Sequence, residues 1–529
     1  MAVITPQTDV YLLKVPLEID STNQLTFLNK TAQFNYFFNL PKVPVDNFTY
    51  QRKDGTIRFG LNFDDLIGYN YVMYRNTAYS DKWFYAFIDG MEYLNDNVTA
   101  ISISTDVWQT WQFDLNYKRT FVEREHVNDD TIGKHTIDEG LELGDFVINS
   151  STTLKPDKTV KDNDNHTINW VFPIVFQTTE LLGAAAGTSA WFDSAYNRVF
   201  SGLYYFGVCS YREARSIIND YAGKPEAIVS IFLAPKEFFD GAIEVTSGGT
   251  SIYIPKDSST ISNLLDATTV SRPTKVDGYT PKNNKLFTYP FSYIYATNNT
   301  GVDAEYRYED FKNTTPKFFI GGALGQGCTT KMCPVDYKGY TGEVFEYGIQ
   351  GAKYPVCAWT SDYYTNWITQ NGVNVGLNLV SGAISTGVNF LSGNAMGTVN
   401  SLLSGIGGTM AQMHQAKMHP DQARGSTNTS DILLGWERYF TVDCLSVRAE
   451  VAETIDNYFT MFGYKVNLVK LPNITGRRNW NFVKTIGCYI DADIPQTDLQ
   501  EIKNMFDKGV TFWHNPTTFM DYSQNNDII

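Results

Sequence analysis

A short stretch in the first third of the chain concentrates acidic and imidazole side chains that could bind a metal ion or transfer protons. Carboxylates and histidines are common zinc ligands and common general acids and bases. The stretch contains Glu123, Glu125, His126, His135, Asp138 and Glu139. Their spacing matches no zinc signature, so we interpret them as residues that support folding or subunit contacts and expect neither a catalytic nor a metal site among them.

Other patterns contain familiar residue types without the remaining parts of a site. Cys328 and Cys333 lie five residues apart, but no second pair follows at zinc-ribbon spacing. A glycine-rich stretch predicts a flexible loop, but the Gly-Lys-Ser/Thr of a phosphate-binding loop does not follow its glycines, which are Gly321, Gly322, Gly325 and Gly327. The sequence also lacks the G-x-S-x-G pattern of many serine hydrolases. We therefore expect no bound cofactor and no enzymatic activity.

The remaining cysteines and two histidines also have ordinary interpretations. The six cysteines are scattered singly, which favours buried thiols in a protein made in a reducing cytoplasm; they are Cys209, Cys328, Cys333, Cys357, Cys444 and Cys488. The first residues do not have the basic and apolar regions of a secretory signal. His414 and His419 could respond to acid, although isolated histidines usually do not have this role.

The composition predicts a large, β-rich protein that does not hold nucleic acid. A length of 529 residues favours several domains. Aromatic residues make up 15% of the chain, and their wide rings pack well on pleated sheets. The net charge of −15 argues against phosphate binding, which needs clustered lysines and arginines. A negative wall would nevertheless suit a conduit through which DNA slides.

Hydrophobic patterns predict strands in the N-terminal part and mixed elements in the middle. Residues 83–88 and the alternating residues 101–104 are typical of strands. A polar stretch at 155–166 indicates a linker or domain boundary. Farther on, a helix at 211–221 is predicted between two strands at 203–209 and 227–234. Loops and short edge strands are expected at 246–284, and aromatic strands return after residue 286.

The last hundred residues predict strands at 439–445, 466–469, 482–490 and 510–513, with two helices between them. The first helix should end at Gly463, and the second should begin with a capping box formed by Thr497 and Gln500 and end at Gly509. The order β-α-β-β-α-β is that of a ferredoxin-like unit. We therefore predict a mainly β, multidomain protein with α+β parts.

A stretch without charge, residues 363–416, is the most unusual feature of the sequence. It contains no Asp, Glu, Lys or Arg, whereas 19% of the whole chain is charged. The length would allow two helical membrane spans. Many asparagines and glycines dilute its apolar residues, and each glycine weakens a helix by about 1 kcal/mol relative to alanine. A permanent transmembrane hairpin is therefore not expected.

Two interpretations of this segment remain open on physical grounds. One is a hairpin buried in an oligomer interface, and the other is a segment stored away from water and released into lipid. Gly393 and Gly397 have the G-x-x-x-G spacing that allows close helix contacts in membranes. The residues expected to contact lipid are Val373, Leu377, Val380, Ile384, Val388, Phe390, Leu391, Gly393, Met396, Gly397, Val399, Leu402, Leu403 and Ile406.

The order of motifs resembles the tail-knob, or distal tail tube, proteins of small short-tailed phages of the protein-primed Picovirinae type. Near the start, the resemblance lies at 82–87 (KWFYAF), 106–111 (DVWQTW), 124–127 (REHV) and 136–141 (TIDEGL). Near the end, it lies at 463–467 (GYKVN), 470–473 (KLPN), 498–502 (DLQEI) and 506–514 (FDKGVTFWH). These blocks cover roughly the first quarter and the last fifth of the chain, and 153–284 has no match.

The resemblance implies a homohexameric tube at the distal end of a virion tail, through which genomic DNA passes without specific binding. Long apolar loops of such proteins plug the tube and come out at infection to open the host cytoplasmic membrane. Other tail proteins, such as the collar or tail tube and the appendages, are the expected partners. The alternatives are a receptor-binding or purely structural tail protein, or a tail-associated enzyme that degrades the cell wall.

The predicted division of the chain follows from these features. It consists of an N-terminal β-rich tube domain (1–150), an α+β knob domain with surface loops (151–284), a further β-rich domain (285–362), the uncharged loop (363–416), a linker (417–431) and the C-terminal ferredoxin-like domain (432–529).

Overall fold

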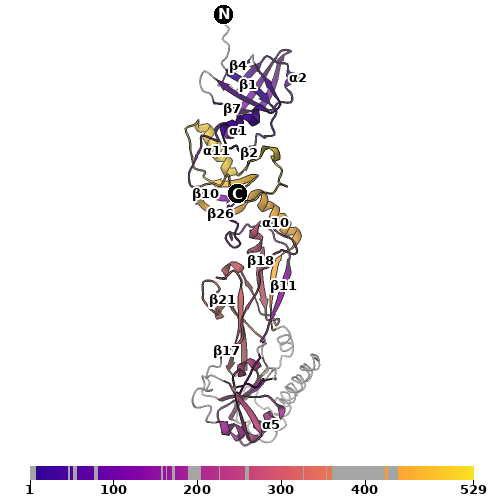
Figure 1. Ribbon diagram of the computed structural model, residues 1–529, viewed down its shortest axis with the longest axis vertical. Helices are drawn as coiled ribbons and strands as arrows, with labels where there is room; N and C mark the ends of the chain where they lie inside the picture. Colours follow the sequence, from indigo (N-terminus) through magenta and orange to yellow (C-terminus); the bar gives the residue numbers. More distant parts are fainter. Residues whose placement is uncertain are drawn as a thin grey trace. The chain divides into compact units, whose positions relative to one another are not determined.

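The computed structural model divides the chain into two compact units, each built from segments that are distant in sequence (Figure 1). Unit 1 combines Met1–Gly144, Tyr279–Leu286 and Ala449–Ile529, and unit 2 combines Asp145–Gly278 and Phe287–Arg448. The structure describes residues 8–45, 48–51, 56–76, 82–156, 159–162, 164–168, 173–188, 204–224, 227–255, 261–325, 327–352, 354, 356–359, 423–426 and 439–529. The finer division into six segments stays a prediction.

The first sheet of unit 1 has seven strands in the order β3-β1-β6-β7-β8-β5-β4. Its strands are β1 (Thr8–Leu13), β3 (Lys42–Pro44), β4 (Phe48–Gln51), β5 (Thr56–Phe59), β6 (Tyr71–Asn76), β7 (Phe84–Asn95) and β8 (Val98–Thr105). The predicted strands at 83–88 and 101–104 are thus confirmed as parts of β7 and β8. Ile101 is fully buried and its neighbour Ser102 is exposed, as the alternation predicts.

Three helices accompany this sheet: α1 (Lys30–Phe38), α2 (Phe63–Leu66) and α3 (Val107–Trp111). The start of α3 is capped by the buried Asp106, whose carboxylate accepts a hydrogen bond from the Gln109 amide at 3.0 Å. The same carboxylate accepts the Tyr71 hydroxyl at 2.8 Å. Burial raises the pKa of Asp106 to about 6. Asp106 therefore joins a helix start to the core of the sheet.

The second sheet of unit 1 joins the two ends of the chain in the order β2-β29-β27-β10-β26. Its strands are β2 (Asn23–Leu25), β10 (Thr120–Glu125), β26 (Tyr464–Lys470), β27 (Trp480–Ile486) and β29 (Val510–Trp513). Strand β10 pairs antiparallel with both of its neighbours, since Phe121 lies opposite Val469 of β26 on one side and Ile486 of β27 on the other. Helices α10 (Ala449–Phe462) and α11 (Gln496–Lys508) belong to the same unit, as do the paired short strands β9 (Asn116–Tyr117) and β28 (Ile490–Asp491).

The predicted ferredoxin-like unit is wrong in its strand membership. Apart from the two-residue β28, the elements do follow one another as β-α-β-β-α-β, but the first strand, β25 (Phe440–Val447), pairs in a sheet of unit 2. Its expected place, between the third and the last strand, is absent because β27 pairs directly with β29. In addition, β10 from the N-terminal part separates β26 from β27. The capping box is also wrong, since α11 begins at Gln496 after Pro495 without a side-chain cap.

Unit 2 contains two four-stranded sheets. One has the order β11-β25-β18-β19, with β11 (Phe146–Leu154), β18 (Ser292–Thr297) and β19 (Asp303–Tyr306). The other has the order β17-β20-β21-β22, with β17 (Ile261–Thr269), β20 (Lys317–Gly325), β21 (Gly327–Val335) and β22 (Ile349–Gln350). Buried residues of both sheets, including Ile294, Phe318 and Phe440, belong to one hydrophobic core.

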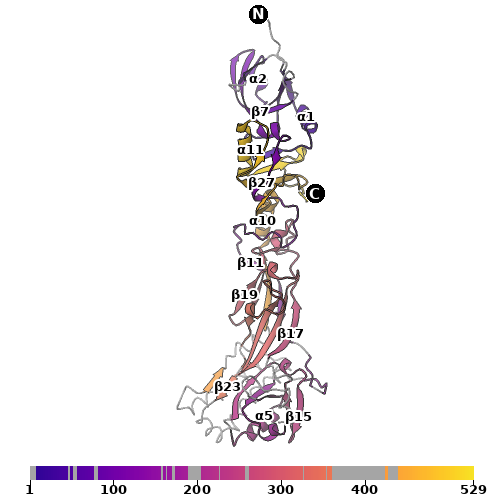
Figure 2. The same cartoon turned by 90° about the vertical axis from the view of Figure 1, so that its left-hand side faces the viewer.

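The third sheet of unit 2 has seven strands in the order β15-β16-β13-β12-β14-β23-β24. They are β12 (Ile174–Thr178), β13 (Tyr204–Val208), β14 (Ile228–Leu233), β15 (Ile243–Ser247), β16 (Thr250–Ile254), β23 (Val356–Trp359) and β24 (Ala423–Ser426). Helix α5 (Tyr211–Asp220; Figure 2) packs against β16 and confirms the predicted helix. Its buried Ile217, Ile218 and Tyr221 form the expected apolar face, and Ser210 and Glu213 form a capping box at its start.

The described part of the chain contains no helix long and apolar enough to cross a membrane. The uncharged segment 363–416, with all fourteen residues expected to contact lipid, lies outside the described residues, as do His414 and His419.

Candidate functional site

The acidic and imidazole stretch predicted to be structural is positioned in unit 1 by β10 and the loop after it. Glu139 has a fully buried side chain that forms ion pairs with Arg124 and Lys285, whose side chains are also almost completely buried. The same carboxylate accepts a hydrogen bond from the Lys465 amide at 3.0 Å. Burial lowers the pKa of Lys285, which the Glu139 carboxylate opposes. Glu139 thus joins β10, residues 279–286 and β26.

His126 follows β10 and is held as a neutral imidazole. Its Nδ1 accepts a hydrogen bond from the Phe482 amide at 2.8 Å, and its Nε2 lies 3.0 Å from the Thr460 carbonyl oxygen. These contacts place the proton on Nε2. Burial, and then the charge of Arg477, lower the pKa of His126 to about 3. Both ring nitrogens form hydrogen bonds with backbone groups, so this histidine is not available to a metal or a substrate.

The other members of the stretch do not converge on a common point. Glu125 forms an ion pair with Lys470 and accepts the Asn473 amide, and Glu123 pairs with Lys484 at 2.9 Å. Asp138 accepts the Gly140 amide within its own turn. His135 is partly exposed, and its Nε2 lies 2.8 Å from the Asp129 carbonyl oxygen. The contacts are those of residues that join segments of a fold.

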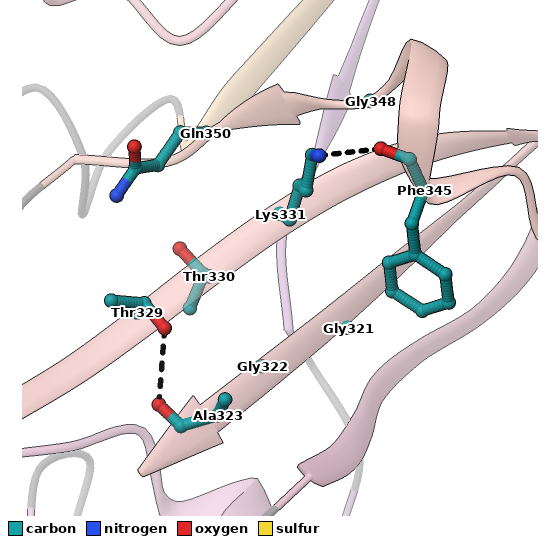
Figure 3. Close-up of a pocket in the computed structure, with 9 residues that line it drawn as sticks. All are labelled: Gly321, Gly322, Ala323, Thr329, Thr330, Lys331, Phe345, Gly348 and Gln350. Carbon is teal, nitrogen blue, oxygen red and sulfur yellow. Dashed lines mark hydrogen bonds between the residues drawn. The ribbon is translucent and has the colours of Figure 1, made fainter. Parts of the chain in front are cut away.

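A pocket of about 670 Å³ lies on the β17-β20-β21-β22 sheet of unit 2 (Figure 3). It is lined by Gly321, Gly322 and Ala323 of β20, by Thr329, Thr330 and Lys331 of β21, and by Phe345, Gly348 and Gln350. The Lys331 ammonium donates to the Phe345 carbonyl oxygen, and the Thr329 hydroxyl donates to that of Ala323 at 3.3 Å. The site offers an aromatic ring, hydroxyls, an amide and one cation.

The predicted flexible glycine loop is wrong, because these glycines lie in paired strands β20 and β21. Packing explains the glycine at 322, where an added Cβ would stand 2.5 Å from the Phe238 ring and 2.7 Å from Leu264. Cys328 and Cys333 are buried free thiols on β21, as expected. Burial raises the pKa of both thiols, that of Cys333 to about 11.

A second cluster of possible ligands, which sequence reasoning missed, lies in unit 2. Asp162 and His166 come from the polar stretch that was interpreted as a linker, and Glu244 comes from β15. One ligand atom of each residue lies within 4.8 Å of the others. Asp162 and His166 are four residues apart, which is a weak signal, and nothing in the sequence connects them to Glu244.

Comparison with known proteins gives matches over nearly the whole chain. Residues 255–527 match the family model described as the C-terminal domain of the Bacillus phage phi29 tail knob protein gp9. Residues 6–116 match the model of the caudoviral major tail protein N-terminus.

Individual relatives and a solved structure agree with these matches. The chain is 24% identical to the tail knob protein gp9 of Bacillus phage phi29 and 25% identical to that of Bacillus phage B103, with 98% of each chain covered. The structure of the bacteriophage C1 tail knob protein gp12 matches 99% of this chain and 100% of its own, with a TM-score of 0.62 and 15% identity. At that identity the likeness concerns the fold.

Proposed function

Because the chain belongs to the phage tail knob family represented by phi29 gp9, and is thus a component of the virion tail, we propose that it forms a DNA-conducting distal tube that also opens the host membrane. The family match over more than half of the chain carries this proposal. The mainly β fold and its likeness to another tail knob protein support it. We assign the chain no enzymatic activity.

The tube is proposed to be a homohexamer that contacts other phage tail proteins, such as the collar or tail tube and the appendages. Six copies together carry a formal charge of −90 (6 × −15). A negative wall repels the phosphate backbone, so DNA can slide past without being held. Specific binding of DNA is therefore not part of the proposed role.

The membrane role is proposed for the uncharged segment 363–416. Its composition supports a stretch that is kept from water inside the tube and contacts the host cytoplasmic membrane during infection. The proposed lipid contacts are the fourteen residues between Val373 and Ile406 that the sequence predicts to meet lipid. Small residues such as Gly393 and Gly397 would allow close packing between copies in the bilayer.

Purified full-length protein tests both parts of this proposal. Electron microscopy should show a six-fold ring, and the protein should release dye from liposomes. Deletion of residues 370–415 should leave the ring and abolish the leakage. Leakage that persists in the deletion variant would refute the membrane role alone, whereas the absence of a ring in the intact protein would refute the tube.

A matched pair of variants separates lipid insertion from a general effect of added charge. The double variant Phe390→Lys and Leu403→Lys places two charges in the segment, where burial in hydrocarbon costs several kcal/mol, on the order of 3 per lysine. The control, Ile132→Lys and Ile148→Lys, adds the same charges at positions that are 42% and 59% exposed. Leakage should fall only in the first variant.

Receptor binding is a second candidate function, which the pocket on the β17-β20-β21-β22 sheet favours. Its volume of about 670 Å³ lies within the usual range of pockets that bind small ligands. Phe345 contributes an aromatic ring to the lining, and Gln350 contributes an amide. This combination suits a sugar unit of a cell-surface polymer. Phe345→Ala should then weaken binding to isolated host cell walls, while Tyr340→Ala, at an exposed aromatic residue outside the lining, should not.

A further inference from the structure

We propose that Asp162, His166 and Glu244 of unit 2 bind a divalent metal ion of the zinc class, which ties the loop after Thr159 to strand β15. The three residues supply one imidazole nitrogen and two carboxylate oxygens, all within 4.8 Å of one another. This donor set suits Zn²⁺, which accepts histidine and carboxylate ligands and completes its shell with water.

Asp162 is held in an orientation that leaves one oxygen for an ion. The residue is only 5% exposed, and its Oδ1 accepts the amides of Asp164 at 3.0 Å and His166 at 2.7 Å. The other oxygen, Oδ2, lies 3.1 Å from Nδ1 of His166. Backbone donors that fix a ligating carboxylate are the usual support around metal sites. An ion would take the position of the proton between Oδ2 and Nδ1.

The loop and β15 are already connected by main-chain contacts. Lys161 and Thr167 form a β-bridge that closes the loop, and the Gly241 amide donates to the Lys161 carbonyl oxygen at 2.7 Å. Glu244 follows three residues later on β15 and pairs with Tyr253 of β16. The backbone therefore presents Glu244 to the loop in the absence of a metal. A site with this support loses little conformational entropy when the ion binds.

The local charge also favours a cation. Among the described residues, neither Asp162 nor Glu244 forms an ion pair with a lysine or an arginine, and the Lys161 ammonium instead donates to Asn165. The ligand atoms of Asp162 and Glu244 lie within 4.8 Å of each other. Two carboxylates at this distance repel each other, and a divalent ion would neutralise both.

Titration of the tag-free, full-length protein with Zn²⁺ against a chromophoric chelator tests the site. One equivalent per chain should bind, and His166→Ala and Glu244→Gln should each weaken that binding at least about tenfold. The matched control is Asp164→Asn, because Asp164 is an exposed carboxylate of the same loop outside the cluster. The affinity of this control variant for Zn²⁺ should stay within about twofold of that of the intact protein. Mg²⁺ at the same concentration should not displace Zn²⁺ from the intact protein.

Thermal unfolding gives a second measurement, because an ion that binds only the folded state stabilises it. The temperature at the midpoint of unfolding should be higher with Zn²⁺ than with a metal chelator, both for the intact protein and for Asp164→Asn. In His166→Ala and Glu244→Gln the two temperatures should be the same. His166 has a side chain that is 74% exposed, so its replacement should leave the fold intact. Binding that is absent, that Mg²⁺ displaces, or that persists unchanged in both ligand variants would overturn the proposal.

Discussion

Glu139 is the residue on which three distant segments of unit 1 converge. Its fully buried carboxylate contacts Arg124, Lys285 and the Lys465 amide. Such a group stabilises the fold only while all its partners are present, because removing one charge leaves the others buried without compensation. The sequence identified Glu139 as chemically notable, but its role depends on partners that only the fold brings close.

The substitution Glu139→Gln should lower the free energy of unfolding of unit 1 by about 3–5 kcal/mol, because two buried cations lose their counterion. The matched control, Glu123→Gln, removes a partly exposed ion pair with Lys484 and should cost about 0–1 kcal/mol. Urea unfolding followed by tryptophan fluorescence compares the two. Equal effects would contradict the assignment of Glu139 as a buried anchor.

The neutral state of His126 predicts a specific dependence of stability on pH. Its pKa is about 3 in the folded protein and about 6.5 when unfolded, so the unfolded chain binds more protons between these values. The neutral His126 therefore makes its full contribution to the free energy of unfolding above pH 6.5, and this contribution is lost as the pH falls toward 3. Between pH 7.5 and 4.5 the loss should be on the order of 3 kcal/mol.

The variant His126→Gln measures this contribution. Its stability should lie below that of the intact protein at pH 7.5, and the gap should narrow by about 3 kcal/mol at pH 4.5. The control Asn473→Ala removes an amide that donates to the His126 carbonyl oxygen and takes up no proton, so its difference from the intact protein should not narrow. A gap of constant size in His126→Gln would mean that the imidazole takes up its proton equally in both states.

Among the elements, the end of α10 shows how a local signal and a tertiary contact act on one residue. Gly463 was expected to stop the helix, and it follows the last residue, Phe462, with φ of +64°. An added Cβ would also stand 2.2 Å from the carbonyl oxygen of Glu125 on β10. The first property is visible in the sequence, and the second arises because β26 pairs with β10.

Gly463→Ala should therefore destabilise the protein by about 4 kcal/mol or more. The backbone at Glu125 would have to move, and the alanine would have to adopt a strained positive φ. Gly487→Ala is the matched control. Gly487 has a similar φ of +66° but nothing within 4 Å of an added Cβ, so only the conformational cost of about 1–2 kcal/mol remains. Thermal unfolding midpoints of the two variants measure the difference, and similar midpoints would exclude the close contact.

At the scale of the whole molecule, each unit is completed by segments from both halves of the chain. β10 needs β26 and β27 as neighbours, and β25 lies between β11 and β18. We therefore expect that the C-terminal residues do not fold as an independent domain. An isolated fragment would expose unpaired strand edges and apolar faces that the full chain covers.

Co-expression of residues 1–416 and 417–529 as two separate chains tests this arrangement. The two pieces should copurify as a stable complex, because the pairings of β10 and β25 supply many interstrand hydrogen bonds. Expressed alone, residues 417–529 should be insoluble or unfolded by circular dichroism. A folded and monomeric C-terminal piece would show that this segment does form a domain of its own.

Local patterns were enough to predict several of the elements and the family to which the chain belongs. The alternation at 101–104, the apolar face of α5 and the stop at Gly463 depend on neighbours within a few residues, and so did the motifs that indicated a tail knob protein. The absence of charge in 363–416 is likewise a property of the sequence alone, and its membrane role stays a proposal.

Tertiary structure decided which elements meet. The insertion of β10 between β26 and β27 replaced the expected ferredoxin-like sheet, and the pairing of β20 with β17 and β21 made strands of an expected loop. Glu139 with Lys285, and Asp162 with Glu244, lie far apart in the sequence. Strand pairing depends on registers and contacts between distant segments, and local spacing carries no information about those contacts.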